Sequence, residues 1–86
     1  MVFKISPESV SVNGKFHFRT FKNKVISITA LGDEIHPKLL IRKAKDLGAP
    51  ECELDRKLRD LFNGHDKRLK RRRSEYGGYC YEKIAN

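Results

Sequence analysis

Apolar and polar residues alternate along the first third of the chain. The alternation over residues 10–21 continues on both sides of Asn13-Gly14, a pair that tolerates the positive φ angles of tight hairpins. A two-residue loop would place the valines and the phenylalanines on opposite faces, whereas a three-residue loop pairs Val12 with Phe16 and gives one apolar face. The longer loop is therefore predicted. Residues 25–31 are rich in β-branched side chains and predict the next antiparallel strand.

The faces of these strands follow from the two-residue period of a pleated sheet. The residues predicted to face the core are Phe16, Phe18, Ile26, Ile28 and Ala30. Those predicted to face solvent or a partner are His17, Arg19, Phe21 and Thr29. Phe3 and Ile5 add a short edge strand that Pro7 ends. The amino-terminal part is thus predicted to be a sheet of three or four antiparallel strands.

Two helices are predicted after the strands, at residues 37–47 and from Pro50 to Asn63. Pro37 suits a first helical position because its missing N–H would have no intrahelical partner. Gly48 supplies the stop between the two helices. The second helix carries acidic residues in its first turn and basic residues later, the order that the helix dipole favours. The apolar stripes of the two helices are Leu40, Ala44 and Leu47, and then Leu54, Leu58, Leu61 and Phe62.

Small and branched residues recur at fixed positions across the turn between these helices. Ala44 is on the first helix, Gly48 is at the turn, and Leu54 and Leu58 are on the second helix. At this spacing a small residue lets the helices approach, a glycine makes the turn, and branched side chains fix the crossing angle. The segment of residues 40–59 therefore resembles the helix-turn-helix of small phage repressors. The resemblance implies that the second helix enters the major groove of DNA.

The start of that second helix departs from the pattern. Glu51 and Glu53 stand where a recognition helix meets DNA, and carboxylates there repel phosphates, although glutamate can accept a hydrogen bond from cytosine. An ordinary αα-hairpin with a glycine cap accounts for the same residues without any DNA contact. Both interpretations remain open from the sequence.

The charge of the chain favours a polyanionic partner. A length of 86 residues fits one compact domain and excludes a large multi-layer enzyme. The 19 Lys and Arg residues outnumber the 11 Asp and Glu residues, which gives a net charge of +8. The excess is densest near the carboxyl end. We therefore divide the chain into a compact domain of residues 1–64 and a basic, tyrosine-containing extension of residues 65–86.

Basic and aromatic residues follow one another in the predicted extension. Six of the seven residues 67–73 are basic, which favours contact with several phosphates, although a solvated tail or a localisation signal also accounts for the run. Tyr76, Tyr79 and Tyr81 either stack on unpaired bases, which would favour RNA or single strands, or pack the tail on the sheet. The strand face that carries Arg19 is either a second nucleic-acid surface or an ordinary solvated face.

Metal-binding and catalytic signatures are incomplete. Cys52 and His65 have a spacing found inside zinc fingers, but the other cysteine and histidine of that signature are missing. No nucleophile motif or phosphate-binding loop accompanies the scattered histidines. We therefore expect two free thiols, at Cys52 and Cys80, with no metal, no cofactor and no enzyme activity. The chain lacks an apolar run of ~18 residues, so we expect a cytoplasmic protein, nuclear or in the nucleoid if bound to DNA, without membrane contact.

Together these features predict an α+β fold, in which a three- to four-stranded antiparallel sheet precedes two helices and a basic C-terminal extension. The predicted function is non-catalytic nucleic-acid binding, with DNA favoured over RNA, by a small regulator of phage or mobile-element type. The predicted phosphate contacts are Lys67, Arg68, Lys70, Arg71, Arg72 and Arg73. The residues predicted to extend this surface or to discriminate sequence are Arg42, Lys43, Lys45, Arg56, Lys57 and Arg19. The alternatives are an inhibitor or adaptor that docks on an acidic host protein, and an arginine-rich RNA-binding protein; homodimerisation stays open.

Overall fold

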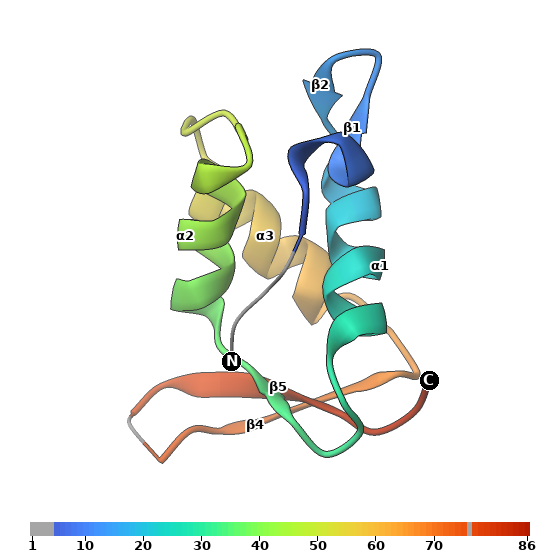
Figure 1. Cartoon of the computed structure of the whole chain (residues 1–86). Coiled ribbons are helices and arrows are strands. Elements are labelled where there is room, and N and C mark those ends of the chain that lie inside the picture. The colour runs from blue at the N-terminus through green and yellow to red at the C-terminus, as the bar shows by residue number, and fades with distance from the viewer. Residues whose placement is uncertain (1–4, 76) are drawn as a thin grey trace.

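Three helices lie on one side of a three-stranded sheet, and a small hairpin lies at the far end of the helices (Figure 1). The computed structural model describes residues 5–75 and 77–86. Within them the α+β fold is confirmed, with three helices and two small antiparallel sheets. The elements are η1 (Pro7–Val10), β1 (Ser11–Val12), β2 (Lys15–Phe16), α1 (Phe18–Ile28), β3 (Glu34–Ile35), α2 (Pro37–Asp46), α3 (Leu54–Asn63), β4 (Leu69–Arg73) and β5 (Tyr79–Lys83).

The larger sheet has the strand order β3-β5-β4, and both pairings are antiparallel. Ile35 of β3 lies opposite Tyr81 of β5, which in turn lies opposite Arg71 of β4. Ile35 and Tyr81 are buried in one core with residues of all three helices, so this row of side chains is on the helix side of the sheet. Successive side chains of a strand alternate between faces. The neighbouring rows therefore project from the outer face, away from the helices.

Helix α1 occupies residues for which the sequence predicted strands. Phe21, Val25 and Ile26 of α1 are buried in the core, at a spacing that fits one face of a helix. The helix begins after His17, whose Nδ1 accepts a hydrogen bond from the Thr20 backbone N–H at 3.3 Å. The two strands predicted across residues 16–31 are therefore wrong, apart from Phe16, which ends β2.

The helical conformation also reverses several predicted orientations. Phe21 and Thr29, predicted to face outward, are buried. Ile28, predicted to face the core, is 39% exposed, and Ala30 is exposed as well. A helix turns by about 100° per residue, so every third or fourth side chain meets the core rather than every second one. Ile5 is buried but belongs to no strand, and Phe3, the other half of the predicted edge strand, lies outside the described residues.

The hairpin at Asn13-Gly14 is present with a shorter loop than predicted. Val12 pairs with Lys15, so the loop holds two residues, and the predicted pairing of Val12 with Phe16 is wrong. Asn13 and Gly14 have φ angles of 54° and 77°, as a tight two-residue turn requires. Each strand of this hairpin is only two residues long, so no continuous apolar face is built from it, and Val12 remains 48% exposed.

Helices α2 and α3 correspond to the two predicted helices. Leu40, Ala44 and Leu47 are buried as predicted, and Gly48 ends the first helix with a φ of 94°. Helix α3 begins at Leu54 and not at Pro50, because its N-cap residue Glu53 has left-handed backbone angles and residues 50–53 form the turn. The acidic residues 51 and 53 thus belong to the turn and not to the first helical turn.

The predicted basic extension is not shown by the structure. Strands β4 and β5, both within residues 65–86, form a hairpin, and β5 is the central strand that pairs with β3. Tyr81 of β5 is 2% exposed and packs on Phe62 of α3, with ring centroids 5.6 Å apart. Because β3 is an isolated two-residue strand until β5 joins it, the sheet and part of the core depend on this hairpin.

Candidate nucleic-acid interface

The basic run of β4 is divided between the two faces of the sheet. Arg71 lies opposite Tyr81 and so belongs to the helix side, together with Arg73 two residues further along. Lys70 and Arg72 alternate with them and project from the outer face. The sequence presents these cations as one cluster, whereas the strand separates them into two pairs with different surroundings.

Arg72 is neutralised on the outer face. Its guanidinium forms ion pairs with Glu34 of β3 and, at 3.3 Å from Nε to Oε1, with Glu82 of β5. The Cys80 thiol donates a hydrogen bond to Glu34 over an Sγ–Oε2 distance of 3.1 Å. This hydrogen bond and the charge of Arg72 hold the pKa of Glu34 below its ordinary value. With carboxylates on either side, Arg72 has little charge to offer a phosphate.

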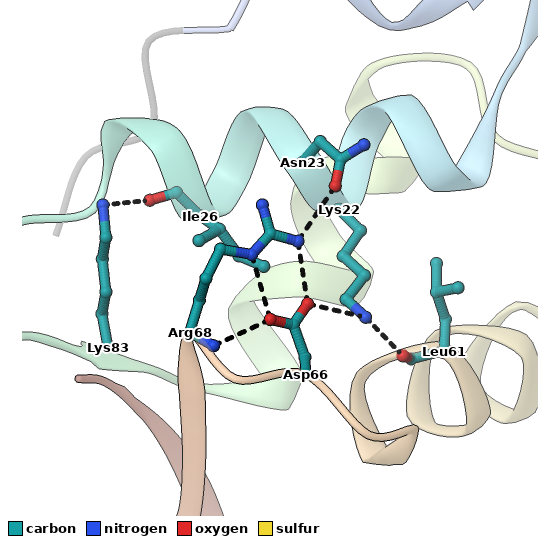
Figure 2. A network of polar contacts seen from close by, with 7 residues as sticks. All are labelled: Lys22, Asn23, Ile26, Leu61, Asp66, Arg68 and Lys83. Carbon is teal, nitrogen blue, oxygen red and sulfur yellow. Dashed lines mark hydrogen bonds and ion pairs between the residues drawn. The ribbon is translucent and has the colours of Figure 1, made fainter. Parts of the chain in front are cut away.

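Arg68 is engaged in a polar network that joins α1, the end of α3 and the start of β4 (Figure 2). Asp66 accepts hydrogen bonds from the backbone N–H, Nε and Nη2 of Arg68 at 2.9, 3.0 and 2.8 Å. Lys22 lies 3.2 Å from the same carboxylate and donates to the Leu61 carbonyl, while Arg68 also reaches Asn23. The Arg68 hydrogen bonds, with the added contact of Lys22, hold the pKa of Asp66 well below its usual range.

The cations on the helix side of the β4–β5 hairpin are not neutralised by carboxylates of the described residues. Arg71 lies over the ring of Tyr79, with Cζ 5.2 Å from the ring centroid. Neither Arg71 nor Arg73 forms an ion pair with any residue that the structure describes. Both border an open hollow of about 680 Å³ in the hairpin, which Arg72, Gly77, Gly78 and Tyr79 also line. Lys67 and Arg71 line a groove that continues beside the end of α3.

Two further cations come from the helices. Lys38 of α2 and Arg59 of α3 line a hollow of about 250 Å³ where α2, α3 and the hairpin meet, with Tyr79 on its other side. Arg59 also pairs with Asp55 of its own helix. Neither cation was among the predicted contacts. The three hollows are linked by Arg71 and Tyr79, each of which lines two of them, and we use the name basic hollow for the set Lys38, Arg59, Lys67, Arg71, Arg73 and Tyr79.

The predicted cations of α2 continue from this surface. Lys38, Arg42 and Lys45 lie at the i, i+4, i+7 spacing of one helical face, and all three are exposed. Lys43 is half-buried and lies off this stripe. The spacing was the signal in the sequence that would have added Lys38 to the predicted set.

The remaining predicted contacts lie elsewhere on the molecule. Arg56 has a side chain 76% exposed on α3, with carboxylates 3.8 and 4.0 Å from its guanidinium. The Lys57 ammonium lies 5.5 Å from the ring centroid of Phe18, at the start of α1. Arg19 is exposed in the first turn of α1, at the end opposite the larger sheet (Figure 1). Lys57 and Arg19 are thus not brought together with the basic hollow.

The three tyrosines differ in their surroundings. Tyr81 is buried and donates a hydrogen bond to Asn63 Oδ1 at 2.6 Å. Its burial, with a smaller contribution from Tyr79, raises the pKa of Tyr81 to about 12. Tyr79 is half-buried, with Arg71 on its ring, and Tyr76 lies outside the described residues. Of the two predicted roles, packing therefore accounts for Tyr81, whereas the ring of Tyr79 forms part of the basic surface of the hairpin.

Comparisons with protein-family models, with curated proteins and with solved structures found no significant match for this chain. No helix among the described residues is long and apolar enough to cross a bilayer. The functional argument therefore depends on the site itself.

Proposed function

We propose that this chain is a non-catalytic DNA-binding protein that holds duplex phosphates in the basic hollow. The observation that supports this most is the charge on the helix side of the hairpin. Arg71 and Arg73 point to the same side as Lys38, and none of the three forms an ion pair among the described residues, whereas carboxylates neutralise Arg72 on the other face. Guanidinium groups suit phosphate oxygens because they donate two parallel hydrogen bonds.

The arrangement of the elements around the hollow supports duplex DNA as the partner. Helices α2 and α3 and the turn between them are the segment that resembles a helix-turn-helix. The β4–β5 hairpin follows them in the chain and lies next to them, so the order of the elements is that of a winged helix-turn-helix (Figure 1). In helix-turn-helix proteins the second helix lies in the major groove, and nearby cations contact the backbone. This part of the argument is an analogy at the level of the fold.

The charges of α3 favour contacts with the DNA backbone over contacts that recognise individual bases. Arg56 and Arg59 both have carboxylates of their own helix region nearby, so neither is an uncompensated donor for guanine. Glu51 and Glu53 in the turn are acidic and repel phosphates. We therefore propose a regulator whose affinity comes mainly from phosphate contacts, with weak discrimination among sequences.

The test is a salt titration of binding to duplex DNA, single-stranded DNA and RNA of matched length, followed by fluorescence anisotropy. The double variant Arg71→Gln/Arg73→Gln removes two phosphate contacts, so the slope of log affinity against log salt should fall in magnitude by about 2. The matched control Lys15→Gln/Arg19→Gln removes the same charge near the start of α1, at the end of this helix that lies away from the larger sheet. The control variant should keep the salt slope and the DNA affinity close to those of the wild type.

The outcomes separate the competing functions. Equal weakening by both double variants would show that net charge acts without a site, and the basic hollow would be rejected. A preference for RNA over duplex would replace DNA with RNA as the partner. If no polynucleotide binds at low salt while an acidic protein does, the protein-binding inhibitor becomes the correct interpretation.

A further inference from the structure

The outer face of the larger sheet carries three side chains that ligate metals. Glu34 and His36 lie on either side of Ile35, and Cys80 precedes Tyr81, the partner of Ile35 across the sheet. His36 has extended backbone angles, φ −99° and ψ 128°, so the alternation of β3 continues through it. One ligand atom from each of Glu34, His36 and Cys80 lies within 4.8 Å of the other two. None of the three belongs to the cations of the basic hollow, although His36 also borders the hollow between α2, α3 and the hairpin.

The carboxylate of Glu34 is oriented toward the other two groups. Its Oε2 is 3.1 Å from Cys80 Sγ and 3.6 Å from His36 Nε2. Tetrahedral zinc would hold a sulfur and an oxygen ligand about 3.5 Å apart, and a nitrogen and an oxygen ligand about 3.3 Å apart. The Arg72 guanidinium binds the other oxygen, Oε1. Oε2 thus faces the thiol and the imidazole while Arg72 fixes the carboxylate from behind.

We propose that Glu34, His36 and Cys80 bind one zinc ion on the outer face of the sheet. A thiolate, an imidazole and a carboxylate together suit zinc, whereas calcium and magnesium prefer oxygen ligands alone. Cys80 is fully buried, while Glu34 and His36 are half-buried, so the ion reaches the thiol from the solvent side through them. Solvent supplies the fourth ligand. Arg72 acts as an outer partner of the carboxylate, as groups behind metal ligands commonly do.

Zinc binding at this place changes both the proton balance and the fold. The Cys80 thiol gives up its proton to solvent and its hydrogen bond to Glu34, and a sulfur–zinc bond takes their place. The ion then links β3, the first residue before α2, and the central strand β5. Because such a site exists only in the folded chain, bound zinc should raise the melting temperature.

The experiment uses the reduced full-length chain freed of metal. Zinc affinity is measured by competition with a chromophoric chelator, and cobalt substitution reports sulfur ligation through its thiolate charge-transfer absorption. Because Cys80 is buried, the half-exposed positions are substituted instead, as Glu34→Gln and His36→Gln. The control Cys52→Ser removes the exposed free thiol, and His65→Gln removes a second histidine outside the cluster.

The expected result is one equivalent of zinc, with a cobalt charge-transfer band that persists in both controls. Each cluster variant should weaken zinc binding by about tenfold or more, at unchanged circular dichroism. The proposal is overturned if the wild type takes up no stoichiometric zinc. It is also overturned if Cys52→Ser removes the charge-transfer band, or if His36→Gln binds zinc within about threefold of wild type.

Discussion

Removing the carboxylate of Asp66 should destabilise the fold more than any exposed acidic substitution. The Asp66 side chain is 10% exposed and receives the guanidinium of Arg68 and the ammonium of Lys22 (Figure 2). In Asp66→Asn the shape is retained but both cations lose their counterion. Each cation is then held close to the other without compensation.

The size of the stability loss depends on how well each cation is still solvated and hydrogen-bonded after the carboxylate is removed. Removing one partner of a fully buried ion pair costs about 3–5 kcal/mol. The Arg68 side chain is 33% exposed and keeps its hydrogen bond to Asn23, and Lys22 keeps the Leu61 carbonyl. Solvent and these contacts recover part of the loss, so we expect about 2–3 kcal/mol. For a domain of this size that lowers the melting temperature by roughly 10–20 °C.

Urea unfolding followed by circular dichroism at pH 7 measures the loss, with Asp60→Asn as the matched control. The Asp60 side chain is 76% exposed and 4.0 Å from Arg56, so its removal should cost less than about 0.5 kcal/mol. The pKa of Asp66 is lowered in the folded state, so its stabilisation is complete above the unfolded-state pKa of about 4 and is lost as the pH falls further. Wild type and Asp66→Asn should therefore converge in acid. Equal stability of the two asparagine variants at pH 7 would refute the reasoning.

Two other buried polar groups lead to predictions of the same kind. Lys83 is 4% exposed and donates to the carbonyls of Ile26 and Thr29 at 2.7 Å. Lys83→Met leaves these carbonyls without their donor and should lower the free energy of unfolding in urea by about 1–3 kcal/mol. The control Lys70→Met, at an exposed position of β4, should leave the free energy of unfolding nearly unchanged. The pKa of Tyr81 is raised to about 12, so its stabilisation is complete below the unfolded-state pKa of about 10 and is lost as the pH rises to 12. A spectrophotometric titration should show one late tyrosine that Tyr81→Phe removes, and ordinary ionisation of every tyrosine would contradict this.

The sequence was sufficient where local signals agree with one another. The first predicted helix has a proline at its first position, one apolar face and Gly48 just after its end, and together these signals predict residues 37–47, one residue more than the observed helix. In residues 18–28 the signals conflict. β-branched residues and alternation indicate strands, while Phe21 and Val25 also fit a helical face. Packing of α1 against α3 decides between them, and that contact is not visible in a local pattern.

The site could be predicted only in part, for a different reason. The basic run on β4 was visible as composition, but which of its members are neutralised depends on residues far away in the sequence. Arg72 pairs with Glu34, 38 residues earlier, and Lys22 on α1 meets Asp66 near the start of β4. The Arg72–Glu34 pair follows from the sheet order β3-β5-β4, and the Lys22–Asp66 pair follows from the packing of α1 against α3; the sequence revealed neither. The same order brings the proposed zinc ligands together.

The ion pairs of Arg72 have a consequence beyond their modest free energy. Partly exposed pairs contribute little to stability. Their geometry, however, exists in only one register of β4 on β5, because a slip by one residue moves every side chain to the opposite face. In a slipped register Arg72 would leave Glu34 and Glu82, and Lys70 and Arg72 would replace Arg71 and Arg73 on the helix side. The carboxylates on the outer face therefore favour the observed register, which leaves Arg71 and Arg73 on the helix side for the proposed phosphate contact.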